Sequence, residues 1–564
     1  MTRNLTWNAR LVPGTIACLA FFSALCVHAQ ATPEKAAHTA GGVISGTVTS
    51  AKTGQPLQDT SLTLTTIQDR KRVAETKTDG DGRFSFDNVP DAKYALRASH
   101  RGYVTAAYQE HPGGISTAIV TGDGLVSTGL EFTLEPQATL YGVVSDDSGD
   151  PVPQARIALY RKDQSSETGR MRRANGTNAD GVGNFEIARL APGNYYLSVS
   201  GTPWYATHRQ SWTYPGGKPA GDERRSPLDV AYPVTYYPDA TDFNAAAAIA
   251  VTAGDRVPVN LVLHAVPAVH ISMQVPSPDQ NQSFSTPQLH QDIFGSDDSV
   301  PTAVNYTRRD PSDPKSTLTV EFGGVAPGQY QLQVGNSNGQ PGSYANVSAS
   351  SGNSKVDLSS AVPLAEVSGK VTVAGVEGML KGLSIALLPQ QAGNRSGAQV
   401  EQDGSFHLQS LRSGVYRVEF TVPSHTMTVT QLSAAGGAVD GHLLKIGGEP
   451  ISLTATIAET TASVRGFAML DGKPVSGVFL LLVPAGSSAS RDPSQANQSD
   501  SDGSFDFPGL APGAYTLLAI QEGWTLDWGR PEVIAPYLPR GLKVTVPLHA
   551  KEIDLKDPVE VQAK

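Results

Sequence analysis

DGSFDFPGLAPGAY, residues 502–515, is the most informative part of the sequence. Related versions occur four times earlier, as DGRFSFDNVPDAKY (81–94), VGNFEIARLAPGNY (182–195), LTVEFGGVAPGQY (318–330) and DGSFHLQSLRSGVY (403–416). Ten residues separate the first inward apolar residue from the tyrosine every time: Phe84 to Tyr94, Phe185 to Tyr195, Val320 to Tyr330, Phe406 to Tyr416 and Phe505 to Tyr515. A constant interval of this kind indicates five copies of one structural unit.

Each copy has the pattern of two short strands. Apolar residues alternate, as in Phe505-Asp-Phe507, so one side of the strand is expected to face a core. Asp-Gly opens three copies, at 81–82, 403–404 and 502–503. Pro-Gly precedes the tyrosine in three, at 192–193, 327–328 and 512–513. Asp-Gly favours a tight hairpin turn and Pro-Gly a second turn, so the interval is predicted to be strand, turn, strand.

A second pattern lies upstream of the repeated stretch. A strand with a central glycine is followed by a Gly-x-Pro turn and another apolar strand; the glycines are Gly46, Gly142, Gly369 and Gly466. The fourth copy lacks the proline, and the third, which begins near Val269, lacks both features. The starts recur about every hundred residues, the size of a seven-stranded sandwich. We therefore predict an all-β chain, a tandem array of about five antiparallel β-sandwiches of Ig-like or transthyretin-like type.

The length and composition agree with several separate cores. A chain of 564 residues is too long for a single core. Its 56 glycines and 39 prolines, beside only 17% charged residues, suit many turns in an all-β fold rather than disorder. The predicted segments are a signal peptide (1–29), a linker (30–42), a first sandwich (43–136), a second (137–268) with an aromatic-rich extension (201–245), a degenerate third (269–363), a fourth (364–459) and a fifth (460–564).

The N-terminus has the features of an export signal. Arg3 and Arg10 precede an apolar run, residues 11–27, and VHA at 27–29 matches the small-x-small pattern before a cleavage site. Pro13 and Gly14 interrupt the run, which argues against a membrane anchor. We expect the signal to be removed and no integral membrane segment to remain.

Cysteine content and net charge limit the cellular locations and the classes of partner that the sequence allows. Cys18 and Cys26 both lie in the predicted signal, so disulfides and thiolate metal sites are excluded from the mature chain. An exported protein without disulfides fits a Gram-negative periplasm, an outer-membrane-associated location or the exterior. The net charge is −10 and the basic residues are scattered, so we expect no nucleic-acid partner.

These patterns resemble the carboxypeptidase regulatory-like domain, a transthyretin-like sandwich with a glycine-centred strand, Gly-x-Pro, Asp-Gly-x-Phe and Pro-Gly-x-Tyr. The first, second and fifth units match well, the fourth partly, and the third only through VAPGQY (325–330). The strings at 234–257 and 530–541 are similar to tandem proteins of this kind from bacteria, with an acidobacterial source as one candidate. The resemblance implies a fold classed with carbohydrate-binding sandwiches and supplies no activity.

Patterns that could carry catalysis or a metal ion have structural interpretations. His549 and Glu552 form a His-x-x-Glu pair, but a zinc peptidase needs a distant second histidine and none follows. Asp-Gly-Asp-Gly at 79–82 lacks the glutamate and further oxygen ligands of a calcium loop, which favours a hairpin turn. No nucleophile elbow, P-loop or dinucleotide fingerprint occurs in its required strand-to-helix context. We predict a non-enzymatic protein without catalytic residues, metal or cofactor.

Aromatic residues outside the repeats are the candidate binding residues. The extension after the second unit carries Trp204, Tyr205, Trp212, Tyr214, Tyr232, Tyr236 and Tyr237; the one after the fifth carries Trp524 and Trp528. Flat amphipathic rings on long loops can stack on sugars, so a carbohydrate site is predicted at Trp204, Tyr205, Trp212, Tyr214, Tyr236 and Tyr237.

Two functions remain open from the sequence. In the first, the chain is an exported β-sandwich protein that binds carbohydrate or another cell-surface polymer, with polysaccharide or envelope proteins as partners. The alternative is a purely structural or adhesive spacer of the bacterial envelope, in which the same rings fill the space between neighbouring sandwiches.

Overall fold

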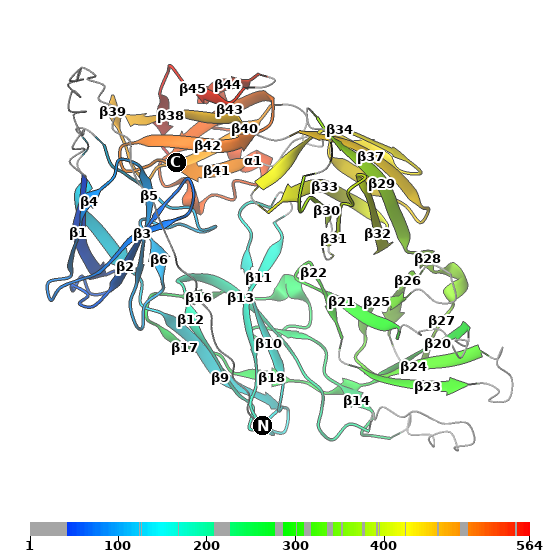
Figure 1. The fold of residues 1–564 in the computed structure, drawn as a ribbon. Helices are drawn as coiled ribbons and strands as arrows, with labels where there is room; N and C mark the ends of the chain where they lie inside the picture. The colour runs from blue at the N-terminus through cyan, green and yellow to red at the C-terminus, as the bar shows by residue number, and fades with distance from the viewer. Residues whose placement is uncertain are drawn as a thin grey trace, which may run out of the picture. The chain divides into compact units, whose positions relative to one another are not determined.

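The computed structural model describes most of the chain beyond residue 41. It describes residues 42–564 apart from 123–124, 126, 167–168, 208–225, 277–285, 301, 309–316, 336–341, 351–352, 375–377, 379, 391–392, 394, 424, 459–461, 486–493 and 548–549. These residues form tandem β-sandwiches, coloured from blue to red along the chain in Figure 1, which confirms the predicted all-β fold class. The predicted signal peptide lies outside the described residues.

We number the five sets of strands as units one to five. Unit one contains β1 (Gly42–Ser50), β2 (Ser61–Thr66), β3 (Arg72–Lys77), β4 (Arg83–Val89), β5 (Lys93–Ser99), β6 (Ala106–Ala107), β7 (Ile119–Val120) and β8 (Ser127–Leu134). Unit two contains β9 (Ala138–Asp146), β10 (Arg156–Lys162), β11 (Met171–Asn178), β12 (Asn184–Leu190), β13 (Gly193–Ser200), β14 (Val230–Ala231), β15 (Thr235–Tyr236), η2 (Phe243–Ala245), β16 (Ile249–Val251), β17 (Arg256–Pro258), β18 (Leu261–Leu263) and β19 (Val266–Pro267).

Unit three contains β20 (Val269–Pro276), β21 (Gln288–Ile293), β22 (Ser296–Ser299), β23 (Ala303–Arg308), β24 (Thr317–Val325), β25 (Gly328–Val334), β26 (Ser343–Ala349), β27 (Asn353–Val356), η3 (Leu358–Ser360) and β28 (Val362–Pro363). Unit four contains β29 (Ala365–Val373), β30 (Ser384–Pro389), β31 (Ser396–Gln399), β32 (Ser405–Leu411), β33 (Gly414–Val422), β34 (His425–Ala435), β35 (Ala438–Asp440), β36 (Leu443–Ile446) and β37 (Ile451–Ala458). Unit five contains β38 (Ala462–Leu470), β39 (Lys473–Pro474), β40 (Phe479–Pro484), β41 (Gln495–Gln498), β42 (Ser504–Leu510), β43 (Gly513–Ile520), η5 (Gly523–Thr525), α1 (Pro531–Ile534), η6 (Leu538–Arg540), β44 (Leu542–Val546), β45 (Glu552–Asp554) and β46 (Val559–Gln562). The unit boundaries given above stay predictions.

The same core strand pairings recur in every unit, and in units four and five further pairings join the two layers of each into one nine-stranded sheet. In unit one, the first layer contains the strands β4-β1-β8 and the second contains β3-β2-β5. In unit three, the corresponding strands are β24-β20-β27 and β22-β21-β25. The first and closing strands, such as β1 and β8, are parallel, which the expectation of antiparallel sandwiches did not include. They can be parallel because a crossover from the other layer, not a hairpin, joins them to one another.

The repeated tyrosine fastens a corner between the two layers. In unit five β42 pairs with β38 and β43 pairs with β40, so the Pro-Gly turn passes from one layer to the other. The Tyr515 hydroxyl donates a hydrogen bond of 2.8 Å to the carbonyl oxygen of Ala511 across this corner. The same bond recurs in the other units, from Tyr94 to Pro90, Tyr195 to Ala191, Tyr330 to Ala326 and Tyr416 to Arg412. The constant interval therefore preserves both a core ring and a bond that closes the corner.

The Asp-Gly turns are corners as well, so the prediction of hairpins was wrong. In unit one β3 pairs with β2 and β4 pairs with β1, so the two strands that flank the turn lie in different layers. Gly82 has a φ of 73° and donates its N–H to the Asp79 carbonyl at 3.0 Å. The Asp79 carboxylate accepts the N–H groups of Asp81 and Arg83 at 3.0 and 2.8 Å. The first acidic residue of the motif thus stabilises the turn.

The central glycine allows the closing strand to approach. A Cβ at Gly46 would lie 2.1 Å from the carbonyl oxygen of Leu130 in β8, which no side chain can tolerate. Gly46 also faces Phe84 across the β1–β4 pair. In unit three Met273 and Val320 face one another instead, so a larger residue opposes a smaller one. Unit three nevertheless has its own buried core, which includes Met273 and Val320.

Candidate functional site

The predicted aromatic site begins where β13 ends at Ser200. Residues 201–207 and 226–245 of the extension are described. Its base is packed on unit two, because a Cβ at Gly201 would lie 3.0 and 3.2 Å from Val152 and Leu263 of the core. Pro203 is also buried. The segment therefore leaves the sandwich along a fixed path.

Trp204 lies at the surface on this anchored segment. Its side chain is 68% exposed. The indole makes an edge-to-face contact with the half-buried ring of Tyr205, with centroids 5.6 Å apart and an interplanar angle of 89°. An exposed indole beside a supported second ring offers an apolar face to a ligand while the rim stays in water.

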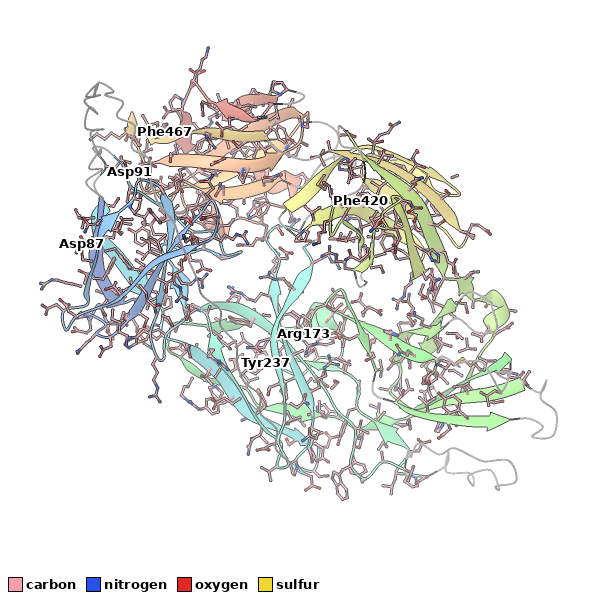
Figure 2. The ribbon with its side chains drawn as sticks, in the orientation of Figure 1. Asp87, Asp91, Arg173, Tyr237, Phe420 and Phe467 are labelled. Carbon is pink, nitrogen blue, oxygen red and sulfur yellow. The ribbon has the colours of Figure 1, made fainter. Side chains whose placement is uncertain are left out.

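The other predicted site residues do not join this surface. Tyr236 is only 2% exposed and packs against Phe294 of unit three, with centroids 4.9 Å apart. Burial raises the pKa of the Tyr236 phenol. Tyr237, labelled in Figure 2, packs against the core of unit two. Tyr236 and Tyr237 are thus structural here, because their rings already contact protein. Trp212 and Tyr214 lie outside the described residues.

The tryptophans after unit five occupy a different environment. Trp524 is 9% exposed and stacks on His111 of unit one, with centroids 4.2 Å apart and an interplanar angle of 3°. Its edge meets Phe479, which Trp528 also contacts. Burial lowers the pKa of His111 and favours its neutral ring. Trp524 therefore fills the space between sandwiches, as the alternative interpretation of the aromatic residues requires.

A charged cluster links Asp229 of the extension after unit two to unit three. His270 Nε2 lies 2.8 Å from Asp229 Oδ2, and His270 Nδ1 lies 2.9 Å from Glu321 Oε1. The hydrogen bond to Glu321 raises the pKa of His270, burial opposes this, and Asp229 raises it further. The extension is thus anchored near its start, at Gly201, and again at Asp229.

A polar cavity of about 330 Å³ at the junction of units three and four was not predicted from the sequence. Gln288, Gln331 and Gln333 of unit three face Arg412 and Ser413 of unit four across it. The only signal was the alternation of glutamines after the repeated tyrosine, at Gln331 and Gln333, which is ordinary for the outer face of a strand. That signal could not reveal that a second unit covers the face.

Neither a metal centre nor a membrane helix is found in the part of the chain that the structure describes. Within it, no group of three or more His, Cys, Asp and Glu side chains is arranged to hold a metal ion. None of its helices has the length and apolar character needed to cross a bilayer.

A comparison with protein families matches the first part of the chain. The family model of the carboxypeptidase regulatory-like domain matches residues 43–135 and 139–222. Units one and two are similar to this domain. The predicted resemblance to carboxypeptidase regulatory-like domains is thereby confirmed for the two units. A comparison with curated proteins gave no match.

The solved structures that match this chain are distant in sequence. The minor pilin GBS52 of Streptococcus agalactiae is 14% identical, and the match covers 40% of this chain and 97% of the pilin with a TM-score of 0.21. The Bacillus anthracis TIE protein is 8% identical over 92% of this chain and 74% of its own, with a TM-score of 0.17. Two B repeat units of the Staphylococcus aureus collagen binding protein are 10% identical to this chain. The match covers 85% of this chain and 93% of the repeat units, with a TM-score of 0.12.

Proposed function

We propose that the protein is an exported, non-enzymatic β-sandwich chain whose second unit binds polysaccharide or another surface polymer through Trp204 and Tyr205. The observation that carries the proposal is the 68% exposure of Trp204 on a segment whose base is buried. Binding residues are commonly placed on loops that a rigid scaffold supports.

The chemistry of the two rings suits a sugar polymer. The indole face can cover the C–H face of a pyranose ring, and the edge-to-face contact with Tyr205 limits how the indole can turn. A polymer presents the same face repeatedly, so one modest contact can be used along its length. The buried Tyr236 and Tyr237 are not part of this proposed surface.

A structural or adhesive spacer is the second candidate. The stacking of Trp524 on His111 supports it, because this ring is used to join sandwiches and is covered by protein. The two functions are compatible if unit two carries the binding surface and the remaining contacts hold the array.

Titration of the full mature chain with soluble polysaccharides, followed by tryptophan fluorescence, tests the proposal. We expect a saturable response that Trp204→Ala weakens at least about tenfold, equivalent to roughly 1.4 kcal/mol. Trp204→Phe is expected to retain part of the affinity because a smaller aromatic face remains. The melting temperature should be unchanged in both variants.

Phe467→Ala is the matched control. Phe467, labelled in Figure 2, is an aromatic residue of β38 that is 48% exposed, but it has no place in the proposed surface. It should leave binding unchanged. The proposal fails if no polysaccharide gives a saturable response, or if Trp204→Ala and Phe467→Ala bind as tightly as the parent.

A further inference from the structure

The junction of units three and four has no free linker. β28 ends at Pro363 and pairs with β26 of unit three, and β29 of unit four begins at Ala365. The one intervening residue, Leu364, is buried and donates its N–H to the Gly342 carbonyl at 2.6 Å. The walls of the polar cavity are thus joined directly through the backbone.

Side chains also cross the junction at the edge of the cavity. Arg412 Nη2 of unit four lies 2.6 Å from Asp297 Oδ2 and 3.3 Å from Gln333 Oε1 of unit three. The Tyr344 hydroxyl of unit three bonds to Ser413 of unit four. These bonds hold the two walls about the cavity of about 330 Å³. This volume falls within the range of about 300–1,000 Å³ that is usual for small-ligand sites.

The charges in the wall compensate one another. Arg412 and Asp297 form an ion pair, and both side chains are largely buried. Burial raises the pKa of Asp297, but its interactions with His290 and Arg412 outweigh this, so the pKa is lowered and the carboxylate stays ionised. The opposite charges of Arg412 and Asp297 thus leave no excess charge from this pair to attract an ionic ligand.

The remaining polar groups in the cavity wall suit hydroxyls. Gln288, Gln331 and Gln333 each carry an amide donor and acceptor, as a hydroxyl does. Tyr344 and Tyr416 also line the cavity, but they are only 8% and 6% exposed, and their hydroxyls are already bonded to Ser413 and Arg412. Amide donors and acceptors of this kind match the hydroxyl groups of a neutral sugar.

We propose that this cavity is a binding site for a neutral saccharide of one or two rings, separate from the polymer surface at Trp204. Asp297 and Arg412 position the walls, and the glutamine amides contact the sugar hydroxyls. The site depends on both units, because unit three supplies the glutamines and unit four closes the cavity.

The experiment uses the full mature chain and isothermal titration with cellobiose and maltose as neutral probes and digalacturonate as an anionic probe. Gln331→Leu removes a cavity amide from β25. Gln329→Leu is the matched control, since Gln329 lies two residues earlier on the same face of β25 and makes an equivalent cross-strand bond, to Ser348, but does not line the cavity. We expect a neutral disaccharide to bind, with about a tenfold loss in Gln331→Leu, as expected for one hydrogen bond of about 1.4 kcal/mol.

Gln329→Leu and Trp204→Ala should bind the neutral disaccharide as the parent does. Trp204→Ala distinguishes this site from the proposed polymer surface, because this variant should weaken polymer binding and leave disaccharide binding unchanged. The proposal is overturned if neither neutral disaccharide binds, if digalacturonate binds more tightly, if Gln331→Leu and Gln329→Leu have equal effects, or if Trp204→Ala abolishes disaccharide binding.

Discussion

The extensions of units two and five carry tryptophans in equivalent places with opposite environments. Trp204 lies four residues after the end of β13, and Trp524 lies four residues after the end of β43. Trp204 is 68% exposed, whereas Trp524 is 9% exposed between His111 and Phe479. An aromatic extension is therefore not in itself a binding site. What the rest of the chain places against it decides whether its ring binds a ligand or joins two sandwiches.

The largest difference between the two extensions should appear in stability. Trp524→Ala removes a buried aromatic ring, and we expect it to lower the free energy of unfolding of unit five by about 3–5 kcal/mol. Scanning calorimetry of the full chain would show this as an earlier transition. An unchanged profile would mean that the Trp524 ring is not packed between His111 and Phe479.

Loss of the corner hydrogen bond before each extension should lower the stability of units two and five by the same, smaller amount. Tyr195→Phe and Tyr515→Phe each remove one corner hydrogen bond, of 2.7 and 2.8 Å. Each change should cost about 1 kcal/mol in its own unit. Chemical denaturation of the two variants would measure both. If the two variants lost clearly different amounts of unfolding free energy, the two corners would not be equivalent. The two extensions that follow them could then not be compared as equivalent segments.

The extension after unit two should also be attached to unit three in a pH-dependent way, through His270. Its pKa is raised by Glu321 and Asp229, so the stabilisation is complete below the ordinary histidine pKa of about 6.5 and is lost as pH rises through the higher folded value. The melting temperature of the parent should therefore exceed that of His270→Gln at about pH 6, and the difference should shrink toward about pH 9. A difference that grew with pH would contradict the assignment.

The smallest effect on stability is expected at Trp204. Because most of its side chain is already in water, Trp204→Ala should change the free energy of unfolding by less than about 0.5 kcal/mol. Calorimetry beside Trp524→Ala gives the comparison directly. A loss approaching that of Trp524→Ala would show that Trp204 is packed, and the proposed polymer surface would have to be abandoned.

Local periodicity was enough to predict the repeated core. Phe505 and Tyr515 share one buried cluster in unit five, as their spacing requires. The pairing of layers was harder to foresee, because a turn sequence specifies its φ angles and not which strands hydrogen-bond on either side. Asp79 to Gly82 therefore forms the expected tight turn but joins two layers instead of closing a hairpin.

Conformation also recurs where the sequence varies. The fourth residue after the first core residue has positive φ in all five units; the residues are Asn88, Arg189, Gly324, Ser410 and Gly509. Two are glycines, but arginine and serine rarely adopt this conformation. The β1–β4 pair has a register shift at this place, so the sheet requires the conformation whatever the side chain.

The all-β class, the five repeats and the core positions could be predicted from the residues alone, because alternation and turn-forming residues act over a few neighbours. The environments of Trp204 and Trp524 and the cavity beside Gln331 could not, because they depend on how distant parts of the chain pack together. Burial and cavity formation depend on residues distant in the chain, such as His111 beside Trp524 and Arg412 opposite Gln333. A short segment does not show which distant residues will pack against it. The same aromatic pattern can therefore be buried between sandwiches in one unit and exposed to solvent in another.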